Sequence, residues 1–175
     1  MKQKICFLII YLITFLTYSQ DIITVSEITI NGNKVTQENI ILREIMFEKS
    51  NSFSITELES KIKESKYNLI NLKLFNFVEI DYVLIGRKAK VTINLTERWY
   101  IWPYPVFEIS ERNFNSWWEE FKTSNYSDFS RLNYGLFLNW NNFRGKNEIV
   151  QLKIRRGFKE HYLLSYQMPY LNKKK

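Results

Sequence analysis

Leu69-Ile-Asn-Leu-Lys-Leu-Phe-Asn-Phe-Val-Glu-Ile-Asp-Tyr82 is the stretch of this sequence in which a helical pattern gives way to a strand pattern. Up to Leu72 the apolar residues keep the spacing of a helix that packs one face on a core. From Phe77 the period becomes two: Val78, Ile80 and Tyr82 face one way, and the acidic residues between them face the other. The stretch therefore predicts a helix that leads directly into a β-strand.

The helix that ends in this stretch is predicted to begin at a capping box formed by Thr56 and Glu59. A polar break at residues 50–54 separates it from an earlier helix, for which Thr36 is the predicted N-cap. One face of the later helix carries Leu58, Ile62, Leu69 and Leu72, with Ser65 in the middle of the apolar stripe.

Two further strands complete a first part that covers residues 21–97. One runs over residues 24–30 and ends at Asn31-Gly32-Asn33, where glycine suits a turn with positive φ. The other follows a turn at Gly86 and turns Val91, Ile93 and Leu95 inward. The order strand, helix, helix, strand, strand predicts an α+β fold with two helices on one face of a three-stranded sheet.

This first part resembles the POTRA domain of outer-membrane assembly factors. The sequence departs from the family pattern at Lys73, where glycine is usual, and at Asn51, near which a proline-glycine turn is common. The resemblance implies a fold and no catalytic site. It is carried by Gly32-Asn33, Thr36, Ile40, Arg43-Glu44, Leu69, Asn71, Leu72, Leu74-Phe75 and Phe77-Val78.

In the POTRA-like order, the last strand lies between the other two, so the strand of residues 77–82 is predicted to be a sheet edge. Such an edge accepts an extended client segment by main-chain pairing, which tolerates many client sequences. Glu79 and Asp81 point away from the core and discourage permanent edge pairing. An edge that binds nothing is the alternative. The predicted client-binding residues are Phe77, Val78, Glu79, Ile80, Asp81 and Tyr82.

The second part, residues 98–175, contains strands patterned for an outer-membrane barrel. Segments 131–140, 148–156 and 161–170 each have one apolar and one polar face and about the length that a tilted strand needs to cross a bilayer. A Pro-interrupted stretch at 104–110 is a fourth candidate. A soluble β-sandwich has the same alternation. The predicted membrane-facing residues are Leu132, Tyr134, Leu136, Leu138, Trp140, Val150, Leu152, Ile154, Tyr162, Leu164 and Tyr166.

Residues 97–118 are similar to the junction between POTRA domain and barrel in a single-POTRA, Bacteroidetes-like branch of the BamA and TamA superfamily, also described as bacterial surface antigens. The alternative readings of the Trp cluster are an aromatic interface belt and a sugar-binding surface on a soluble protein. The matching residues are Glu97 to Pro103, Glu108, Arg112 to Asn115 and Trp117-Trp118, with later landmarks at Asn142 to Asn147 and Pro169 to Asn172.

The first 19 residues have the features of a cleavable signal peptide. Lys2 and Lys4 precede an apolar run that is too short to span a bilayer, and Thr17 and Ser19 suit a cut after residue 19. An uncleaved anchor or a buried helix is the alternative. Cys6 leaves with the signal, so the mature chain is predicted to have no disulfide, no Cys metal site and no thiol chemistry.

The charge balance and the residue types argue against nucleic-acid binding and catalysis. The formal charge of +7 falls to 20 basic against 18 acidic residues once Lys2, Lys4 and the terminal run 173–175 are set aside. His161 stands alone on the polar face of a strand, and the sequence has neither a Gly-rich phosphate loop nor a His-rich metal spacing. We therefore expect no enzyme, no metal and no cofactor, and no nucleic-acid partner.

The resemblance implies an outer-membrane protein assembly or translocation factor, with its POTRA domain in the periplasm. Its partners would be unfolded outer-membrane or secreted client proteins, outer-membrane lipid and subunits of an assembly complex. We expect residues 111–130 to form a long exterior loop and 141–146 a short periplasmic turn. A closed barrel needs at least about eight strands, so the four candidates predict a truncated barrel. The second hypothesis is a free-standing periplasmic POTRA binding module.

Overall fold

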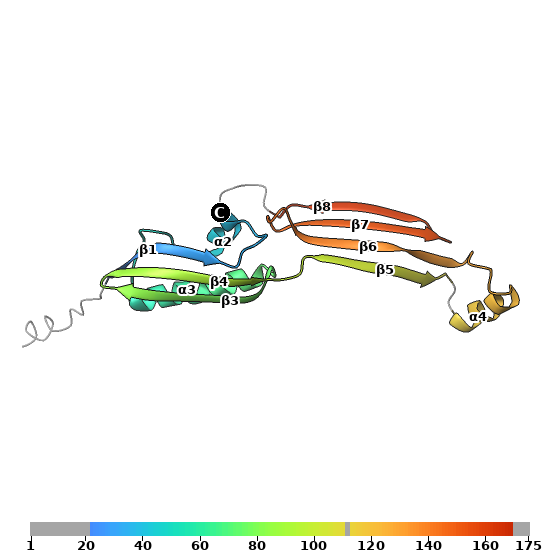
Figure 1. Cartoon of the computed structure of the whole chain (residues 1–175), viewed down its shortest axis with the longest axis horizontal. Helices are drawn as coiled ribbons and strands as arrows, with labels where there is room; N and C mark the ends of the chain where they lie inside the picture. Colours follow the sequence, from blue (N-terminus) through green and yellow to red (C-terminus); the bar gives the residue numbers. More distant parts are fainter. Residues whose placement is uncertain (1–21, 111–112, 170–175) are drawn as a thin grey trace, which may run out of the picture.

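The computed structural model describes residues 22–110 and 113–169. Two four-stranded sheets follow one another along the long axis of the molecule (Figure 1), with strand orders β2-β1-β4-β3 and β5-β6-β7-β8. The predictions on the signal peptide, Cys6, Arg112 and residues 170–175 fall outside the described residues. The fold class, an α+β unit followed by antiparallel strands, is as predicted.

The first sheet has the predicted order of strands and one additional strand. Its elements are β1 (Ile22–Asn31), α2 (Glu38–Glu44), β2 (Ser52–Ser54), α3 (Ile55–Asn71), β3 (Phe75–Ile85) and β4 (Lys88–Glu97). As expected, β4 lies in the middle, parallel to β1 and antiparallel to β3. The prediction of three strands was wrong, because part of the polar break at 50–54 pairs with the start of β1. The Thr24 and Ser52 hydroxyls lie 2.9 Å apart across this pair.

The core of this unit lies between the sheet and α3. Leu58 and Leu69 of α3 and Val91 and Ile93 of β4 are all buried, as the apolar spacing predicted. Ser65, in the middle of the helical stripe, is also buried. Its hydroxyl donates to the Lys61 carbonyl at 2.6 Å and accepts from the Met46 N–H at 2.9 Å. The serine therefore joins α3 to the segment after α2.

Both predicted helix starts were wrong by a few residues. The N-cap of α3 is Ser54, whose hydroxyl accepts from the Glu57 N–H, so the capping residue precedes Thr56 by two positions. The N-cap of α2 is Gln37, which makes no side-chain capping bond. Thr36 is instead buried, with its hydroxyl directed to the second part of the chain. A threonine at this spacing satisfies the rule for caps equally well, so the pattern alone misassigned it.

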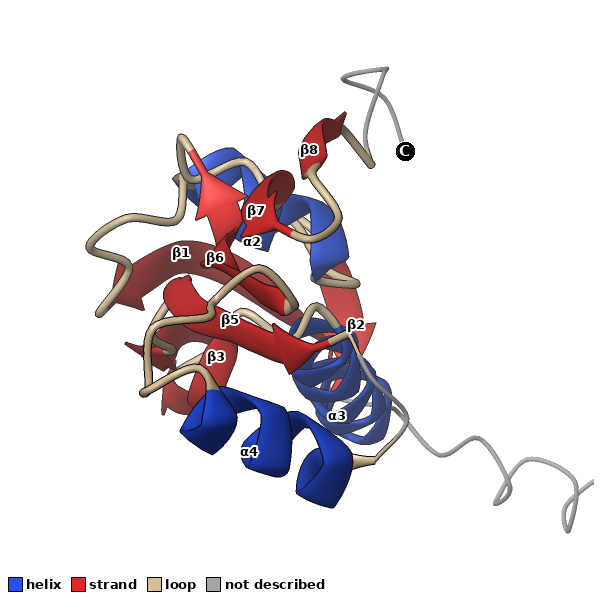
Figure 2. Ribbon diagram, turned by 90° about the vertical axis from the view of Figure 1, so that its right-hand side faces the viewer, coloured by secondary structure: helices blue, strands red, loops and turns tan. Residues whose placement is uncertain are grey.

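The second sheet is an antiparallel meander that contains one unexpected helix. Its elements are β5 (Ile101–Ile109), α4 (Phe114–Thr123), β6 (Leu132–Phe143), β7 (Glu148–Gly157) and β8 (His161–Gln167). The strand predicted over 104–110 begins three residues earlier, because Pro103 and Pro105 lie on an edge strand, where proline is tolerated. The loop predicted over 111–130 contains α4, at the end of the sheet far from the first unit (Figure 1). In the end-on view of Figure 2, this end of the molecule and α4 face the viewer.

Candidate functional surfaces

The register of the second sheet places all eleven predicted membrane-facing residues on one face. Leu138 lies opposite Leu152, which lies opposite Leu164, and the neighbouring rows repeat this pattern. Six of the eleven side chains are exposed, and Leu164 is exposed by 77 %. Of the other five, four are half-buried and Leu132 differs from all the rest. It is buried, and the backbone of its loop neighbours Phe129 and Phe158 bonds to its own. A continuous apolar face of this size is unusual on a surface that meets only water.

The opposite face of the same sheet is mostly polar. Gln151 donates to the Asn139 side chain at 3.2 Å, and Arg155 forms an ion pair of 2.8 Å with Glu108. This ion pair reaches across β6 at Gly135, the residue opposite Arg155. A Cβ atom at Gly135 would lie 2.0 Å from the Ile154 carbonyl oxygen. The sheet therefore has one apolar and one polar face, which is the arrangement of a barrel wall with a polar interior.

The free edge of β5 lacks two N–H donors in its middle. The Ser110 N–H bonds to the Arg131 carbonyl, and the Asn141 N–H bonds to the Tyr100 carbonyl. Tyr100 and Ser110 flank β5, so the even-numbered residues of this strand turn their backbone groups toward β6. Because ladder positions alternate, odd-numbered residues turn their backbone groups to the free edge. Pro103 and Pro105 are among them, and proline has no N–H. In the described residues, β8 is the other free edge of this sheet.

A directed chain of hydrogen bonds joins the two sheets. The Asn142 amide donates to the Thr36 hydroxyl at 2.9 Å, and Thr36 lies 3.2 Å from the Tyr100 hydroxyl. Tyr100 in turn donates to the Leu74 carbonyl at 2.9 Å. Thr36 and Asn142 are nearly inaccessible to water, and burial raises the pKa of Tyr100 above its ordinary value. Every donor in this chain has an acceptor, as buried polar groups require.

Backbone contacts on both sides of this chain fix the loop at residues 33–37. The Glu97 carboxylate accepts from the N–H groups of Val35 and Thr36. The Gln37 N–H bonds to the Gly145 carbonyl at 2.9 Å. Gly145 has a φ of +72°, and a Cβ atom there would lie 2.1 Å from the Val35 carbonyl oxygen. Glu97 and Tyr100, from the segment that resembled a domain junction, therefore contact residues 33–37 of the first unit. Asn142 and Gly145, which resembled later landmarks of the barrel start, contact the same loop. The rest of the predicted junction segment does not lie here, since Phe114, Trp117 and Trp118 belong to α4 at the other end of the second sheet.

The predicted client-binding strand is an edge of the first sheet, since β3 pairs only with β4. Val78 is buried and Ile80 and Tyr82 are half-buried, whereas Glu79 and Asp81 are exposed. Phe77 is also exposed, by 70 %. Beside this edge, α3 and β3 border a groove of about 380 Å³, in which the Tyr82 hydroxyl donates to Glu59 at 2.9 Å. The groove is lined by Glu59, Ile62, Lys63, Lys66, Ile80, Asp81 and Tyr82.

Sequence reasoning missed the aromatic cluster around α4. Trp117 stacks on Phe121 with ring centroids 5.0 Å apart, and Phe114 and Trp118 lie on either side. Tyr126 and Phe129 add edge contacts to Phe121. The spacing of three and four residues between Phe114, Trp117, Trp118 and Phe121 was the available signal, since it is that of a helix face.

Other kinds of site are not evident in the described part of the chain. Within residues 22–110 and 113–169, no group of three or more His, Cys, Asp or Glu side chains is arranged to hold a metal ion. No helix in those residues is both long enough and apolar enough to cross a membrane. His161 lies opposite Arg155, on the polar face of the second sheet.

Comparison with known proteins identifies the first unit. Residues 23–98 match the family described as POTRA, surface antigen variable number repeat. Among solved structures, the crystal structure of BamA from Haemophilus ducreyi lacking POTRA domains 1–3 is similar at 20 % identity and a TM-score of 0.61, covering 86 % of this chain and 25 % of that one. CdiB from Acinetobacter baumannii has 14 % identity and a TM-score of 0.48, with 85 % and 26 % covered. The curated proteins include no match.

Residues 23–98 are therefore a POTRA domain of the surface-antigen family, as the resemblance implied. The described chain has the fold of a POTRA domain followed by strands that resemble the start of the BamA barrel. It spans about a quarter of the length of the BamA and CdiB structures that it matches. Membership of a single-POTRA, Bacteroidetes-like branch stays a prediction.

Proposed function

We propose that this protein acts as an outer-membrane assembly or translocation factor. In this role the POTRA domain lies in the periplasm and binds unfolded clients by strand addition to β3, and the second sheet lies in the outer membrane with its apolar face toward lipid. The single observation that carries the proposal is the register of β6, β7 and β8, which places the eleven predicted membrane-facing residues on one face and leaves the other face mostly polar.

The POTRA domain supports the same proposal through its free edge. Backbone N–H and C=O groups at a sheet edge are a template for an incoming strand, whatever its side chains. The groove beside β3 carries two lysines, one glutamate and one aspartate, so its charges balance and favour neither acidic nor basic clients. Glu79 and Asp81, exposed on the edge, keep such pairing reversible.

The membrane part of the proposal is tested by two arginine substitutions at neighbouring positions of β7. Leu152 belongs to the apolar face and Gln151 to the polar face. Arginine at a lipid-facing site near the bilayer centre costs about 2–4 kcal/mol, whereas a polar barrel interior tolerates it. We expect Leu152→Arg to reduce the amount of protein in the outer-membrane fraction of the native host, and Gln151→Arg to leave it unchanged.

The alternative, a free-standing periplasmic POTRA module, makes the opposite prediction. A mature chain that is monomeric in plain buffer and absent from the membrane fraction would establish this alternative. Equal effects of Leu152→Arg and Gln151→Arg would also contradict the membrane proposal, because the two faces would then be equivalent.

The client-binding part is tested by removing N–H groups from the free side of β3. Two residues, Gly86 and Arg87, separate Ile85 from its partner Lys88, so Ile85 and Lys88 form a hydrogen-bonded pair at the hairpin turn. Hydrogen-bonded and non-hydrogen-bonded pairs alternate along the ladder, so the N–H groups of Leu84 and Tyr82 point to the free edge of β3. We expect Leu84→Pro and Tyr82→Pro to weaken capture of an unfolded barrel-strand peptide, measured by fluorescence anisotropy, while the β3–β4 ladder stays intact.

The matched control is Leu84→Ala, which shortens the same side chain and keeps its N–H. A loss shared by Leu84→Ala and Leu84→Pro would indicate a side-chain contact. Unchanged capture by both proline variants, in chains shown by circular dichroism to be folded, would exclude β3 as the binding edge.

A further inference from the structure

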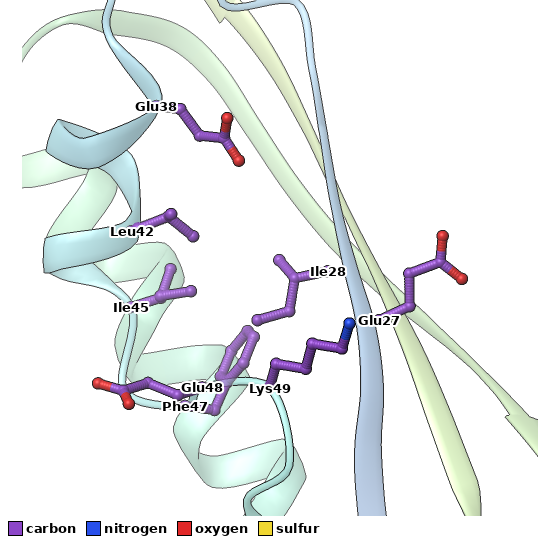
Figure 3. Close-up of a pocket in the computed structure, with 8 residues that line it drawn as sticks. All are labelled: Glu27, Ile28, Glu38, Leu42, Ile45, Phe47, Glu48 and Lys49. Carbon is purple, nitrogen blue, oxygen red and sulfur yellow. The ribbon is translucent and has the colours of Figure 1, made fainter.

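A second groove lies on the other side of the POTRA domain, between β1 and α2 (Figure 3). It has a volume of about 430 Å³ and lies along β1 beyond its pairing with β2, whose first residue, Ser52, is opposite Thr24. Ile28 of β1 points across it toward Leu42 and Ile45, with Phe47 below. The lining residues are Glu27, Ile28, Glu38, Leu42, Ile45, Phe47, Glu48 and Lys49.

The strand that borders this groove has unpaired backbone groups. Val25 still bonds to the segment before β2, since its N–H donates to Asn51 and its carbonyl accepts from Ser50. Its side chain is buried in the core, so in β1 the core-facing residues turn their backbone groups to this side. A register shift between Val25 and Glu27 moves the core-facing positions to Ile28 and Ile30. In the described residues, no strand pairs with β1 on this side beyond Thr24.

The side chains around the groove give an occupant a preferred chemistry. Leu42 is exposed by 39 % although it lies over an apolar floor, so an apolar side chain placed there would be covered on both sides. Glu38 points toward the groove at one end, and its carboxylate forms no ion pair within residues 22–110 and 113–169. Glu27 points away from the groove on the far side of β1 and is already paired with Lys90 at 2.9 Å (Figure 3).

We propose that this groove is a second docking site of the POTRA domain. An extended segment of another polypeptide would pair with β1 at Ile28 and Ile30, place an apolar side chain against Ile28 and Leu42, and set a lysine or arginine beside Glu38. The site differs from the β3 groove in charge: Glu27 is paired with Lys90, and Glu48 and Lys49 offset one another, so Glu38 leaves one unbalanced negative charge among the lining residues. It therefore suits a basic partner segment and not clients of every composition.

The proposal is tested with two synthetic peptides and the mature chain in detergent micelles. One peptide is acetyl-Lys-Thr-Val-Thr-Val-Thr-Lys-amide and the other has glutamate in place of both lysines. Amide chemical shifts of isotope-labelled protein report where each peptide binds. We expect the lysine peptide to shift amides of β1 and α2, and the glutamate peptide to bind at least about fivefold more weakly, which corresponds to roughly 1 kcal/mol.

A charge reversal then assigns the contact. Glu38→Lys should weaken binding of the lysine peptide by about fivefold or more and strengthen binding of the glutamate peptide. Glu57→Lys is the matched control, because Glu57 is exposed on α3 and does not line the groove. Leu84→Pro, which removes an N–H from the β3 edge, should leave this binding unchanged, so failure here and failure of client binding at β3 are distinguishable.

Three outcomes would overturn the proposal. They are equal binding of the two peptides, shifts confined to β3 and α3, and no binding of either peptide at millimolar concentration. If Glu38→Lys and Glu57→Lys weaken binding of the lysine peptide equally, the peptide responds to the overall charge of the domain. That result would likewise exclude the docking site.

Discussion

Asn142 donates a 2.9 Å hydrogen bond to the hydroxyl of Thr36, although 106 positions separate the two residues in the chain. This bond, with its continuation to Tyr100 and Leu74, fixes the POTRA domain against the end of the second sheet. The orientation of the domain relative to the proposed barrel wall therefore depends on a few buried polar groups. Such groups are costly to leave without partners.

Thr36→Val should destabilise the mature chain more than the small change in side-chain size suggests. Valine keeps the shape of threonine but leaves Asn142 without its acceptor, and an unsatisfied buried group costs about 1–3 kcal/mol. Denaturant unfolding of the mature chain in micelles measures this loss. The control is Thr24→Val, at a threonine whose hydroxyl bond to Ser52 is exposed, and we expect it to cost less than about 0.5 kcal/mol.

The double variant Thr36→Val/Asn142→Ala tests whether the two residues act together. If they share one network, the two losses are not additive, with a coupling of about 0.5–3 kcal/mol. Additive losses would show that the bond between them contributes nothing beyond the separate contacts.

Tyr100 gives the junction a dependence on alkaline pH. Burial raises the pKa of Tyr100, so its neutral form, which donates to Leu74, is favoured in the folded state. The resulting stability is fully present below the ordinary tyrosine pKa of 10.0 and is lost as the pH rises through the higher folded-state value. Unfolding free energy measured between about pH 8 and 11 should therefore fall more steeply in the natural chain than in Tyr100→Phe. Parallel curves would contradict this assignment.

Gly145→Ala should disrupt the junction through a steric clash, in addition to the cost of placing alanine at a positive φ. The added Cβ would lie 2.1 Å from the Val35 carbonyl oxygen, which is backbone and not free to move aside. Gly86→Ala is a close control: Gly86 has a φ of +61°, but nothing lies within 4 Å of its Cβ position. We expect Gly86→Ala to cost about 1 kcal/mol and Gly145→Ala clearly more, measured by thermal unfolding. Equal losses would mean that the close approach at Gly145 relaxes without cost.

The sequence was sufficient to predict both helices and three of the four strands of the POTRA domain, and which residues of the barrel-like strands share a face. Both follow from local periodicity: Leu58, Ser65 and Leu69 lie on one helix face, and Leu152 and Gln151 lie on opposite faces of β7, because each pattern needs only neighbouring residues. The strand at Ser52–Ser54 was missed because three residues, one phenylalanine between two serines, are too few to show a period. The helix α4 was missed because residues 111–130 were predicted to form an exterior loop.

For the junction, residues could be singled out from the sequence, but their contacts could not be predicted. The resemblance identified Glu97, Tyr100, Asn142 and Gly145 as landmarks, but it did not indicate what they contact. Thr36 shows the reason: its role depends on Asn142, and contacts between residues so far apart in sequence leave no periodic signal. The groove between β1 and α2 was missed for the same reason, since it exists because β2 pairs with β1 only from Ile22 to Thr24.

Pro103 and Pro105 should limit pairing at the free edge of β5. Both face that edge and supply carbonyl oxygens without N–H groups, so a strand added there leaves its own acceptors unsatisfied, at a cost that is highest in lipid. Pro103→Ala/Pro105→Ala restores both donors and leaves the even-numbered ladder to β6 intact. We expect this double variant of the mature chain to self-associate in micelles at lower concentration than the natural chain, measured by analytical ultracentrifugation.

Pro169→Ala, outside β5, should leave self-association unchanged. If the double variant behaves like the natural chain, the prolines do not control pairing at this edge.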